Sequence, residues 1–318
     1  MTLPRGRAAA SHASEEQLIA RFLAPFSSAE ATRVSIGPGS DCAAVQVLPG
    51  MHLVATTDAL VEGVHFDWRW FSAAQVGHKA LAVNLSDLAA AGANPRWFLC
   101  ALGVPAGDEA RATGIARGMA TLARRHHCAL IGGNVTAARE WSINITALGE
   151  AARPRSRAGA RPGDALVVCG QLGNATAGLC ALRNSSPAPP AALRAQRTPV
   201  PLVEAGLLAR GLATAAIDVS DGFLRDLQRL CKASNVGAEV DCDALPTGRA
   251  ATLEEALTGG EDYALLFSVP QRKLPALHKA IKCLEVGRFS SRQGVRLIEH
   301  GQPRALPKSL GFDHLQTR

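Results

Sequence analysis

A stretch rich in arginine, proline and glycine, "ARPRSRAGARPGD" at residues 152–164, divides the chain into two halves of similar length. On both sides of it, short apolar segments alternate with Gly and Pro breaks, a pattern that indicates strands and helices. A chain of 318 residues is long for one core, so two domains are expected. We therefore predict a mixed α/β (α+β) protein, with a tail over 1–15, a first domain over 16–150 and a second over 151–318.

The first half carries start and stop signals for several elements. "SEEQ" from Ser14 has the form of a helix capping sequence. Residues 34–58 carry β-branched residues near Gly and Pro breaks, which indicates strand, turn and strand. Helical spacing begins at about Ala73 and should end at "GANP". After that break, the patterns predict a strand, a helix and two more strands in "WFLCALGVP", "DEARATGIARGMATLARRHH", "CALIGGN" and "SINITALGE".

The second half shows the same mixture of elements. "ALVVCGQLG" predicts a strand and "NATAGLCALRN" a helix. "SSPAPPAALRAQRTPVP" is a proline-rich stretch that we interpret as a surface excursion. Strand, turn, helix and strand are then expected across "AAIDVSDGFLRDLQRLCKASNVGAEVD".

Composition excludes several classes of function. The net charge is +7, but no basic run is interleaved with aromatic residues and there is one Tyr, which argues against nucleic-acid binding. No stretch reaches the roughly 18 continuous apolar residues of a membrane helix, and the N-terminus lacks the apolar region of a secretory signal. The eight cysteines include no C-x-x-C pair, so neither a zinc site nor a disulfide framework is indicated. A reducing cytoplasm is the expected location.

Three short stretches share one form, an apolar run followed by a hydroxyl residue and an aspartate. They are "VATTD" ending at Asp58, "VNLSD" ending at Asp87, and "IDVSD" ending at Asp221 with Asp218 inside it. One Ser-Asp pair is more often a helix N-cap than a ligand. However, Asp41 and Glu261 stand in related contexts, and none of these six carboxylates has a Lys or Arg immediately beside it, although Arg225 lies one helical turn beyond Asp221. Because buried carboxylates need cations, and hard divalent cations prefer oxygen ligands, a site for several Mg²⁺ ions and a phosphorylated substrate is favoured over scattered caps.

A phosphate site has no standard signature in this chain. The sequence contains neither the G-x-x-x-x-G-K-[ST] loop nor the protein-kinase motifs. Two Gly-containing turns leading out of predicted strands, "LIGGN" and "VCGQLGNATAGL", are possible phosphate contacts. "SDGFLRDL" starts a predicted helix whose free amides, next to Asp221, could receive an anion or its metal.

Four longer motifs closely resemble those of the thiamine-monophosphate kinase family, within the aminoimidazole-ribonucleotide-synthetase-like superfamily. They are "TTDALVEGVHF", "GHKALAVNLSDLAAAGANP", "AIDVSDGFLRDL" and "LTGGEDYALLF", and the likeness runs from about residue 15 to the final "GFDH". The resemblance implies ATP-dependent phosphorylation of thiamine monophosphate to thiamine diphosphate, by direct in-line transfer with several Mg²⁺ ions. It also implies two α/β domains and a homodimer, with the N-terminal sheets of two subunits joined in a barrel at the interface.

The resemblance also assigns roles to individual residues. The metal-binding positions it implies are Asp41, Thr56, Thr57, Asp58, Asp87, Asn134, Asp218 and Asp221, of which Asp58, Asp87 and Asp218 are expected to be catalytic. The ATP contacts it implies are Gly133, Asn134, Arg157 and Ser220. The thiamine contacts it implies are His65, Glu261 and Phe312. From the residues alone, His65 could instead only hydrogen-bond within its loop, and Phe312 could belong to the core.

The chain departs from the family pattern at a few positions. Ser40 stands where the family has the first of two aspartates. The family's "GGDTTRG" is "GGNVTAA" here, so Asn134 replaces an aspartate expected to bind Mg²⁺ and Ala137 stands in place of the motif arginine. His126 and His127 lie where the family often has tyrosines near the nucleotide.

Three functions are compatible with these motifs. The first is an active thiamine-monophosphate kinase, which "VEGVHF" and "GGEDYALLF" favour over the purine enzyme of the superfamily. The second is a diverged protein that binds a nucleotide or thiamine phosphate without turnover. The third is a superfamily relative with another substrate. Selenophosphate synthetase is disfavoured because its reactive N-terminal Cys or selenocysteine has no counterpart, the first cysteine here being Cys42.

Overall fold

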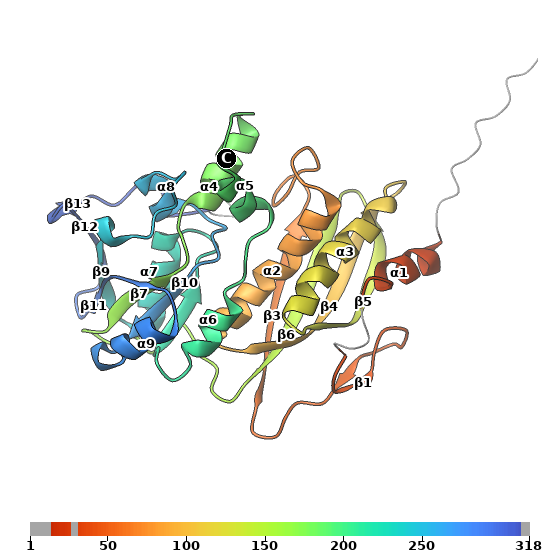
Figure 1. Ribbon diagram of the computed structural model, residues 1–318, viewed down its shortest axis with the longest axis horizontal. Coiled ribbons are helices and arrows are strands. Elements are labelled where there is room, and N and C mark those ends of the chain that lie inside the picture. The colour runs from red at the N-terminus through yellow and green to blue at the C-terminus, as the bar shows by residue number, and fades with distance from the viewer. Residues whose placement is uncertain (1–13, 27–30, 313–318) are drawn as a thin grey trace, which may run out of the picture.

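The computed structural model of the chain describes residues 14–26 and 31–312 (Figure 1). Its α-helices are α1 Glu15–Leu23, α2 Ala73–Ala91, α3 Ala110–Arg125, α4 Asn174–Arg183, α5 Pro190–Arg197, α6 Val203–Leu208, α7 Phe223–Ser234, α8 Leu253–Thr258 and α9 Leu274–Ala280. Its strands are β1 Val34–Ile36, β2 Ala44–Val45, β3 His52–Val61, β4 Asn94–Pro105, β5 Ala129–Ala138, β6 Ser142–Ala151, β7 Ala165–Cys169, β8 Ala215–Asp218, β9 Gly237–Asp241, β10 Leu265–Val269, β11 Leu284–Ser290, β12 Gly294–Glu299 and β13 Gln302–Arg304. Two short 3₁₀ helices are η2 Cys242–Ala244 and η3 Gln271–Lys273.

Most of the predicted N-terminal tail and the end of "GFDH" lie outside the described residues. Within the described part of the chain, no helix is long and apolar enough to cross a membrane.

The first half is built on a four-stranded sheet in the order β3-β6-β4-β5, in which only β4 and β5 are parallel. Successive side chains of a strand point to opposite faces. Accordingly, Phe98 packs in the core beneath α2 and α3, whereas its neighbour Trp97 packs on the other face with residues of the β1–β2 pair. The sheet is open, with β3 and β5 as its edges, so the residues described for one chain form no closed barrel. The barrel across a dimer interface remains a prediction.

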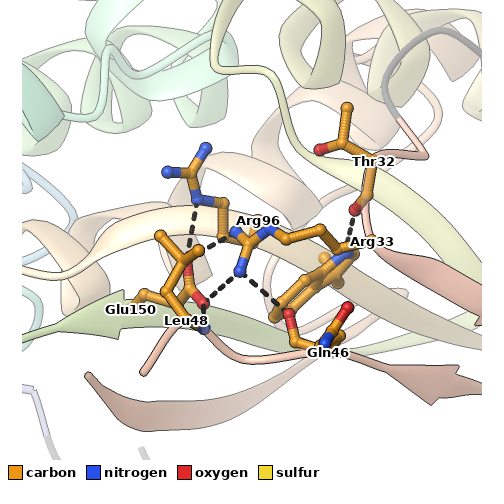
Figure 2. A network of polar contacts seen from close by, with 7 residues as sticks. Thr32, Arg33, Gln46, Leu48, Arg96 and Glu150 are labelled. Atoms are coloured by element: carbon orange, nitrogen blue, oxygen red, sulfur yellow. Dashed lines mark hydrogen bonds and ion pairs between the residues drawn. The ribbon is translucent and has the colours of Figure 1, made fainter. Parts of the chain in front are cut away.

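A buried carboxylate fastens the β1–β2 region to this sheet (Figure 2). Glu150, near the end of β6, has no exposed side-chain surface and accepts hydrogen bonds of 2.6 Å from both terminal nitrogens of Arg33. It also accepts from Arg96 Nε at 3.1 Å and from the Leu48 N–H at 2.9 Å. The Arg33 guanidinium lies 5.2 Å from the ring centroid of Trp97. The hydrogen bonds from Arg33 hold the pKa of Glu150 down at about 2.

The second half is built on a seven-stranded sheet in the order β13-β12-β9-β11-β7-β10-β8, antiparallel except between β9 and β12. Its interior strand β7 is buried along its whole length, as expected for a sheet covered on both faces. Leu166 and Val168 pack in a core with α7, while Val167 and Cys169 face the core that contains α2. Helix α2 therefore lies between the two sheets, with the second half on the left of Figure 1 and the first on the right.

The helix boundaries expected from capping signals are confirmed. Ser14 accepts a hydrogen bond from the Gln17 N–H and starts α1 with a capping box, and Ser72 and Gln75 form another at the start of α2. Helix α2 ends at Ala91 and is capped by Gly92, whose φ of 66° suits a residue without a Cβ. The mixed α/β order expected in both halves is also confirmed.

The proline-rich stretch is largely exposed as far as residue 191, as expected of a surface excursion. It also contains α5, which starts with proline at its first position, where no backbone N–H is needed, and buries Ala192 and Gln196. Two other local expectations are wrong. Asp58 lies inside β3 and not at its end, because β3 continues to pair with β6 as far as Val61. "LIGGN" is not a turn leading out of a strand, because β5 continues to pair with β4 as far as Ala138.

Candidate functional site

A pocket of about 550 Å³ lies where the two halves meet. Its lining combines residues of β3 and α2 with residues from the loops after β8, before β10 and near residue 311. The predicted site residues that line it are Asp58, His65, Asp87, Arg157, Asp218, Ser220, Asp221, Glu261 and Phe312. Segments that are far apart in the sequence thus form one cavity.

One wall of this pocket is acidic, because it is formed by the four aspartates Asp58, Asp87, Asp218 and Asp221. Thr56 donates a hydrogen bond of 2.6 Å from its hydroxyl to Asp87, and Ser86 donates one of 2.7 Å to Asp218. Burial raises the pKa of Asp58, and the charge of Asp87 and a hydrogen bond with it raise this pKa further. Burial also raises the pKa of Asp87, and it raises that of Asp218 together with the charge of Asp87. The wall thus concentrates more negative charge than its surroundings compensate.

The donor atoms of this wall suit hard divalent cations, because they are carboxylate and hydroxyl oxygens. Within residues 14–26 and 31–312, however, no three or more His, Cys, Asp or Glu side chains come together as a ready-made metal site. The metal-binding role of these residues therefore stays a prediction.

Thr57 does not lie with the other expected ligands of β3. Thr56 and Asp58 point to the same side of the strand and Thr57 to the opposite side. The Thr57 hydroxyl donates to the Ile145 carbonyl at 3.0 Å and accepts from the Thr146 hydroxyl at 3.2 Å. Its polar atom is therefore used within the sheet.

Two of these carboxylates have cationic partners that do not stand beside them in the sequence. Arg229 Nη1 lies 2.7 Å from Asp221 Oδ2, and Lys79 Nζ lies 2.7 Å from Glu261 Oε1. Arg229 lies two helical turns beyond Asp221, and Lys79 lies in the other half of the chain from Glu261. Arg225, the neighbour that the sequence suggested, donates to the backbone carbonyl of Phe312.

The amides at the start of α7 are not free to receive an anion. The Asp226 carboxylate, which is fully buried, accepts hydrogen bonds from the N–H groups of Ser220, Asp221 and Gly222 at 3.0, 2.9 and 3.2 Å. An acidic residue in the first turn of the helix thus caps this end itself, and holds the loop that carries Asp221.

The expected thiamine contacts all reach the pocket. His65 Nδ1 accepts a hydrogen bond of 3.1 Å from the Val61 N–H, so the neutral ring carries its proton on Nε2. The loop hydrogen bond and the pocket position of His65 therefore occur together. Phe312 lies at the pocket and outside both large apolar cores, and its N–H donates to the Asp221 carbonyl at 2.8 Å.

Gly133 and Asn134 lie elsewhere, in a second pocket of about 250 Å³ that also contains Ser40. Asp41 is exposed and follows Ser40 directly, but it lines neither pocket. Across the sheet, Asp58 pairs with Ile145, Ile145 with Cys100, and Cys100 with Gly133. Three strand spacings separate the ends of this row, or about 14 Å. One chain therefore does not bring Gly133, Asn134 and Asp41 together with the acidic wall, because the first two lie on the opposite edge strand from Asp58.

Gly133 has a structural reason to be glycine. A Cβ at this position would lie 1.9 Å from the Cys100 carbonyl oxygen of β4, where no side chain fits. Its identity is explained by strand packing, whether or not it also contacts a nucleotide.

Helix α4 contributes pocket residues that sequence reasoning missed, namely Thr176, Leu179, Cys180 and Arg183. The only signal was the flagged stretch "VCGQLGNATAGL", which precedes and enters this helix. Asp262, the next residue after Glu261, does not serve the pocket in this way. Its carboxylate accepts hydrogen bonds from the Gly173 and Ala175 N–H groups at 2.5 and 3.0 Å, at the start of α4.

Two family models match the chain. The model described as AIR synthase related protein, N-terminal domain, matches residues 39–151, and the model described as AIR synthase related protein, C-terminal domain, matches residues 161–299. Similar curated proteins include thiamine-monophosphate kinases of Salmonella typhimurium, at 38% identity over 95% of this chain and 98% of its own length, and of Bacillus subtilis, at 31% identity over 89% and 94%.

Similar solved structures include the thiamine-monophosphate kinase of Stenotrophomonas maltophilia, with a TM-score of 0.81 and 35% identity over 92% of this chain and 98% of that chain. A structure of AaThiL complexed with AMPPCP and TMP has a TM-score of 0.74 and 31% identity, over 84% of this chain and 89% of that one. The hydrogenase maturation protein HypE in complex with ATP has a TM-score of 0.78 at 18% identity over 94% of this chain and 96% of that chain, which shows a shared fold alone.

Proposed function

Since the chain belongs to the thiamine-monophosphate kinases, we propose that its pocket between the two halves transfers a phosphoryl group from ATP to thiamine monophosphate. The observation that carries this proposal is the composition of the pocket, where an acidic wall meets His65, Glu261 and Phe312. The related protein AaThiL was solved with AMPPCP, an ATP analogue, and TMP, which supports the same pair of substrates here.

The acidic wall is the part of the pocket suited to the reacting phosphates. Asp58, Asp87, Asp218 and Asp221 offer carboxylate oxygens, and the raised pKa values of the first three indicate too little positive charge around them. Bound Mg²⁺ ions would supply that charge and neutralise the two anionic substrates as they meet. Asp58, Asp87 and Asp218 would then act by binding these ions and keeping them in position between the two substrates. The positive charge of Arg157 acts on Asp87, and we propose that Arg157 binds a phosphate at the same wall.

Direct transfer needs little proton chemistry. The acceptor is a phosphate oxygen that is already ionised, so no general base has to activate it. The chain must instead hold donor and acceptor in line, which positioning and charge can accomplish. We propose that Glu261 provides negative charge for the cationic thiamine, while the protonated Nε2 of His65 offers it a hydrogen bond.

A second copy of the chain would complete the site. Gly133 and Asn134 stand in the same row across the sheet as Asp58, but on the opposite edge. If β5 of one subunit lies beside β3 of another, these residues approach the acidic wall of the partner. We propose such a homodimer, with the two open sheets closing into one barrel and ATP contacts coming from both subunits.

The purified protein with ATP, Mg²⁺ and thiamine monophosphate should form thiamine diphosphate, detected by chromatography after conversion to the fluorescent thiochrome. Omitting Mg²⁺ or thiamine monophosphate should abolish the product. Tight binding of both substrates without product, even at high enzyme concentration, would instead favour a protein that binds these ligands without turnover.

A further inference from the structure

Lys79 is a buried cation whose two polar partners, Glu261 and the His65 backbone carbonyl, both belong to the expected thiamine side of the pocket. Its side chain is 1% exposed, and its Nζ lies 2.7 Å from Glu261 Oε1. The same nitrogen donates a hydrogen bond of 3.1 Å to the His65 backbone carbonyl and lies 5.4 Å from the ring centroid of Phe71. One ammonium group thus joins the His65 loop of the first half to the Glu261 loop of the second.

Gln196 of α5 holds the other oxygen of the same carboxylate. It is 2% exposed, and its Nε2 donates a hydrogen bond of 2.7 Å to Glu261 Oε2. Its Oε1 is buried and has no hydrogen-bond partner among the described residues. Leaving a buried acceptor unpaired is costly. The orientation of this amide is therefore set by Glu261, which needs donors on both oxygens.

Glu261 is held in a defined pose that leaves part of it open. Its φ is 66°, a left-handed conformation that is strained for a residue with a side chain, and its N–H donates to the Ser220 carbonyl at 2.7 Å. Each carboxylate oxygen has one donor, and 24% of the side chain remains exposed at the pocket. Since an ionised carboxylate can accept about four hydrogen bonds, it retains capacity for a ligand. Burial acts to raise the pKa of Glu261, but the charge and hydrogen bonds of Lys79 and the hydrogen bond of Gln196 lower it overall, so the group is anionic.

A purely structural role explains this arrangement less well. A buried ion pair is weak evidence of stabilisation, because desolvation of both charges offsets their attraction. Here both loops joined by Lys79 reach the pocket. In addition, the Gln196 amide donates to the same carboxylate although this leaves its own buried oxygen without a hydrogen bond among the described residues. Orientation of a binding group accounts for all three contacts.

We propose that Lys79 and Gln196 are positioning residues, which fix the Glu261 carboxylate and the His65 loop in the pose that binds the cationic part of thiamine monophosphate. This inference rests on the proposed function, since it concerns the substrate side of that site. It predicts that both residues matter for thiamine monophosphate and not for ATP.

The test measures the affinities of thiamine monophosphate and of AMPPCP by titration calorimetry, and the two KM values where turnover occurs. Lys79→Met removes the cation at similar length and should weaken thiamine monophosphate binding about ten- to a hundredfold, the size expected for losing a hydrogen bond to a charged group. Gln196→Leu should weaken thiamine monophosphate binding less than Lys79→Met does. Gln196→Glu should weaken it more than Gln196→Leu does, because a second carboxylate then faces Glu261. AMPPCP affinity should change less than about threefold, which separates positioning from general damage to the pocket.

Arg155→Met is the matched control. Arg155 is a partly buried cation at the junction of the halves, and it donates to the carbonyls of Ala89, Ala90 and Gly206, away from the pocket. This variant should unfold at a lower temperature but keep the ratio of the two affinities. If Lys79→Met does not fold, the two Gln196 variants, Gln196→Leu and Gln196→Glu, test the inference without it.

Variants of Lys79 and Gln196 with unchanged thiamine monophosphate affinity, or with equal losses for both ligands, would overturn the inference and leave the kinase proposal standing. Selective loss with no turnover in the unmodified protein would support the inference and overturn the kinase proposal. An unmodified protein that does not bind thiamine monophosphate would overturn both.

Discussion

Glu261 and Asp262 are neighbours in the chain, but their carboxylates serve different parts of the molecule. Glu261 reaches the pocket and meets Lys79, whereas Asp262 caps α4 through two backbone N–H groups. The hydroxyls of Thr56 and Thr57 also have different partners: Thr56 donates to Asp87 at the pocket, whereas Thr57 donates to a backbone carbonyl within the sheet. At the residue scale, the backbone direction decides what a side chain does, and a motif of adjacent polar residues mixes site and scaffold.

Asp58→Ala should abolish turnover while the protein stays folded. Removing this carboxylate takes a charge from the wall that we propose binds the metal ions, and a loss of at least about a hundredfold in kcat is expected. Its raised pKa means that the folded state disfavours the charged form. At neutral pH without Mg²⁺, the melting temperature should therefore stay equal or rise. Activity within a few-fold of the unmodified protein would show that the metal assignment of this motif is wrong.

Asn134→Asp should lower the Mg²⁺ concentration needed for half-maximal activity. An amide oxygen can coordinate Mg²⁺ but lacks the charge that strengthens oxygen sites. Restoring a carboxylate should gain about 1–2 kcal/mol, or roughly five- to thirtyfold in the Mg²⁺ requirement. Magnesium titrations at saturating ATP compare the two proteins. Coincident curves would mean that Asn134 is not a ligand position.

The sequence could predict the residues that share a motif better than the contacts that join motifs. Asp58, Asp87, Asp218 and Asp221 were recognisable because each follows an apolar run, and all four line the pocket. The partners Arg229 and Lys79 were not, because neither lies near its carboxylate in the sequence. The separation of Asn134 from Asp58 also depends on strand order, which no local pattern encodes.

At the scale of elements, α2 supplies several pocket groups from one face. Lys79, Val83 and Asp87 are spaced four residues apart, so they lie on the same side of the helix. Val83 and Asp87 line the pocket, and Lys79 stands behind Glu261. Arg155 bonds to the last carbonyls of this helix, so the segment between the two halves also fixes its end. The helix thereby sets the distance between the acidic wall and the thiamine side.

Glu150→Gln should loosen the β1–β2 region of Figure 2. The amide cannot accept from Arg33 with both former oxygens, and two arginines lose their counter-charge. Breaking one partner of a buried pair costs about 3 kcal/mol in the free energy of unfolding. Chemical denaturation at neutral pH measures this loss, and Arg69→Gln, which breaks the exposed pair with Asp67, is a control that should change little.

The same network predicts a pH dependence of stability. The pKa of Glu150 is about 2 in the folded protein, below its ordinary value of 4.5. An acid with a lowered folded pKa contributes stability that is fully present above its unfolded pKa and is lost as the pH falls through the folded one. The difference in stability between the unmodified protein and Glu150→Gln should therefore shrink between about pH 4.5 and 2. A constant difference down to pH 2 would contradict this account.

At the scale of the whole molecule, the two pockets of one chain would belong to different active sites of the dimer. Mixing two inactive variants tests this arrangement. Asp58→Ala damages the acidic wall, and Asn134→Trp fills the second pocket. A mixed dimer would combine both defects in one site and leave the other intact. Since half of the dimers are mixed and half of their sites are intact, about a quarter of the normal activity should return.

A second mixture controls for this effect. Asp58→Ala and Asp87→Ala both damage the acidic wall of their own subunit, so no site of their mixed dimer is intact. This mixture should stay inactive after the subunits are exchanged. Recovery in both mixtures, or in neither, would contradict a site shared between subunits.

The apolar core around α2 has a consequence for how the protein folds. It contains Leu81, Leu85 and Leu88 of this helix together with Val167 and Phe267 from the sheet of the second half. Although two separate family models match the halves, this shared core leaves neither one with a complete interior of its own. The halves should therefore unfold in one cooperative transition, and either half produced alone should expose this apolar face and aggregate.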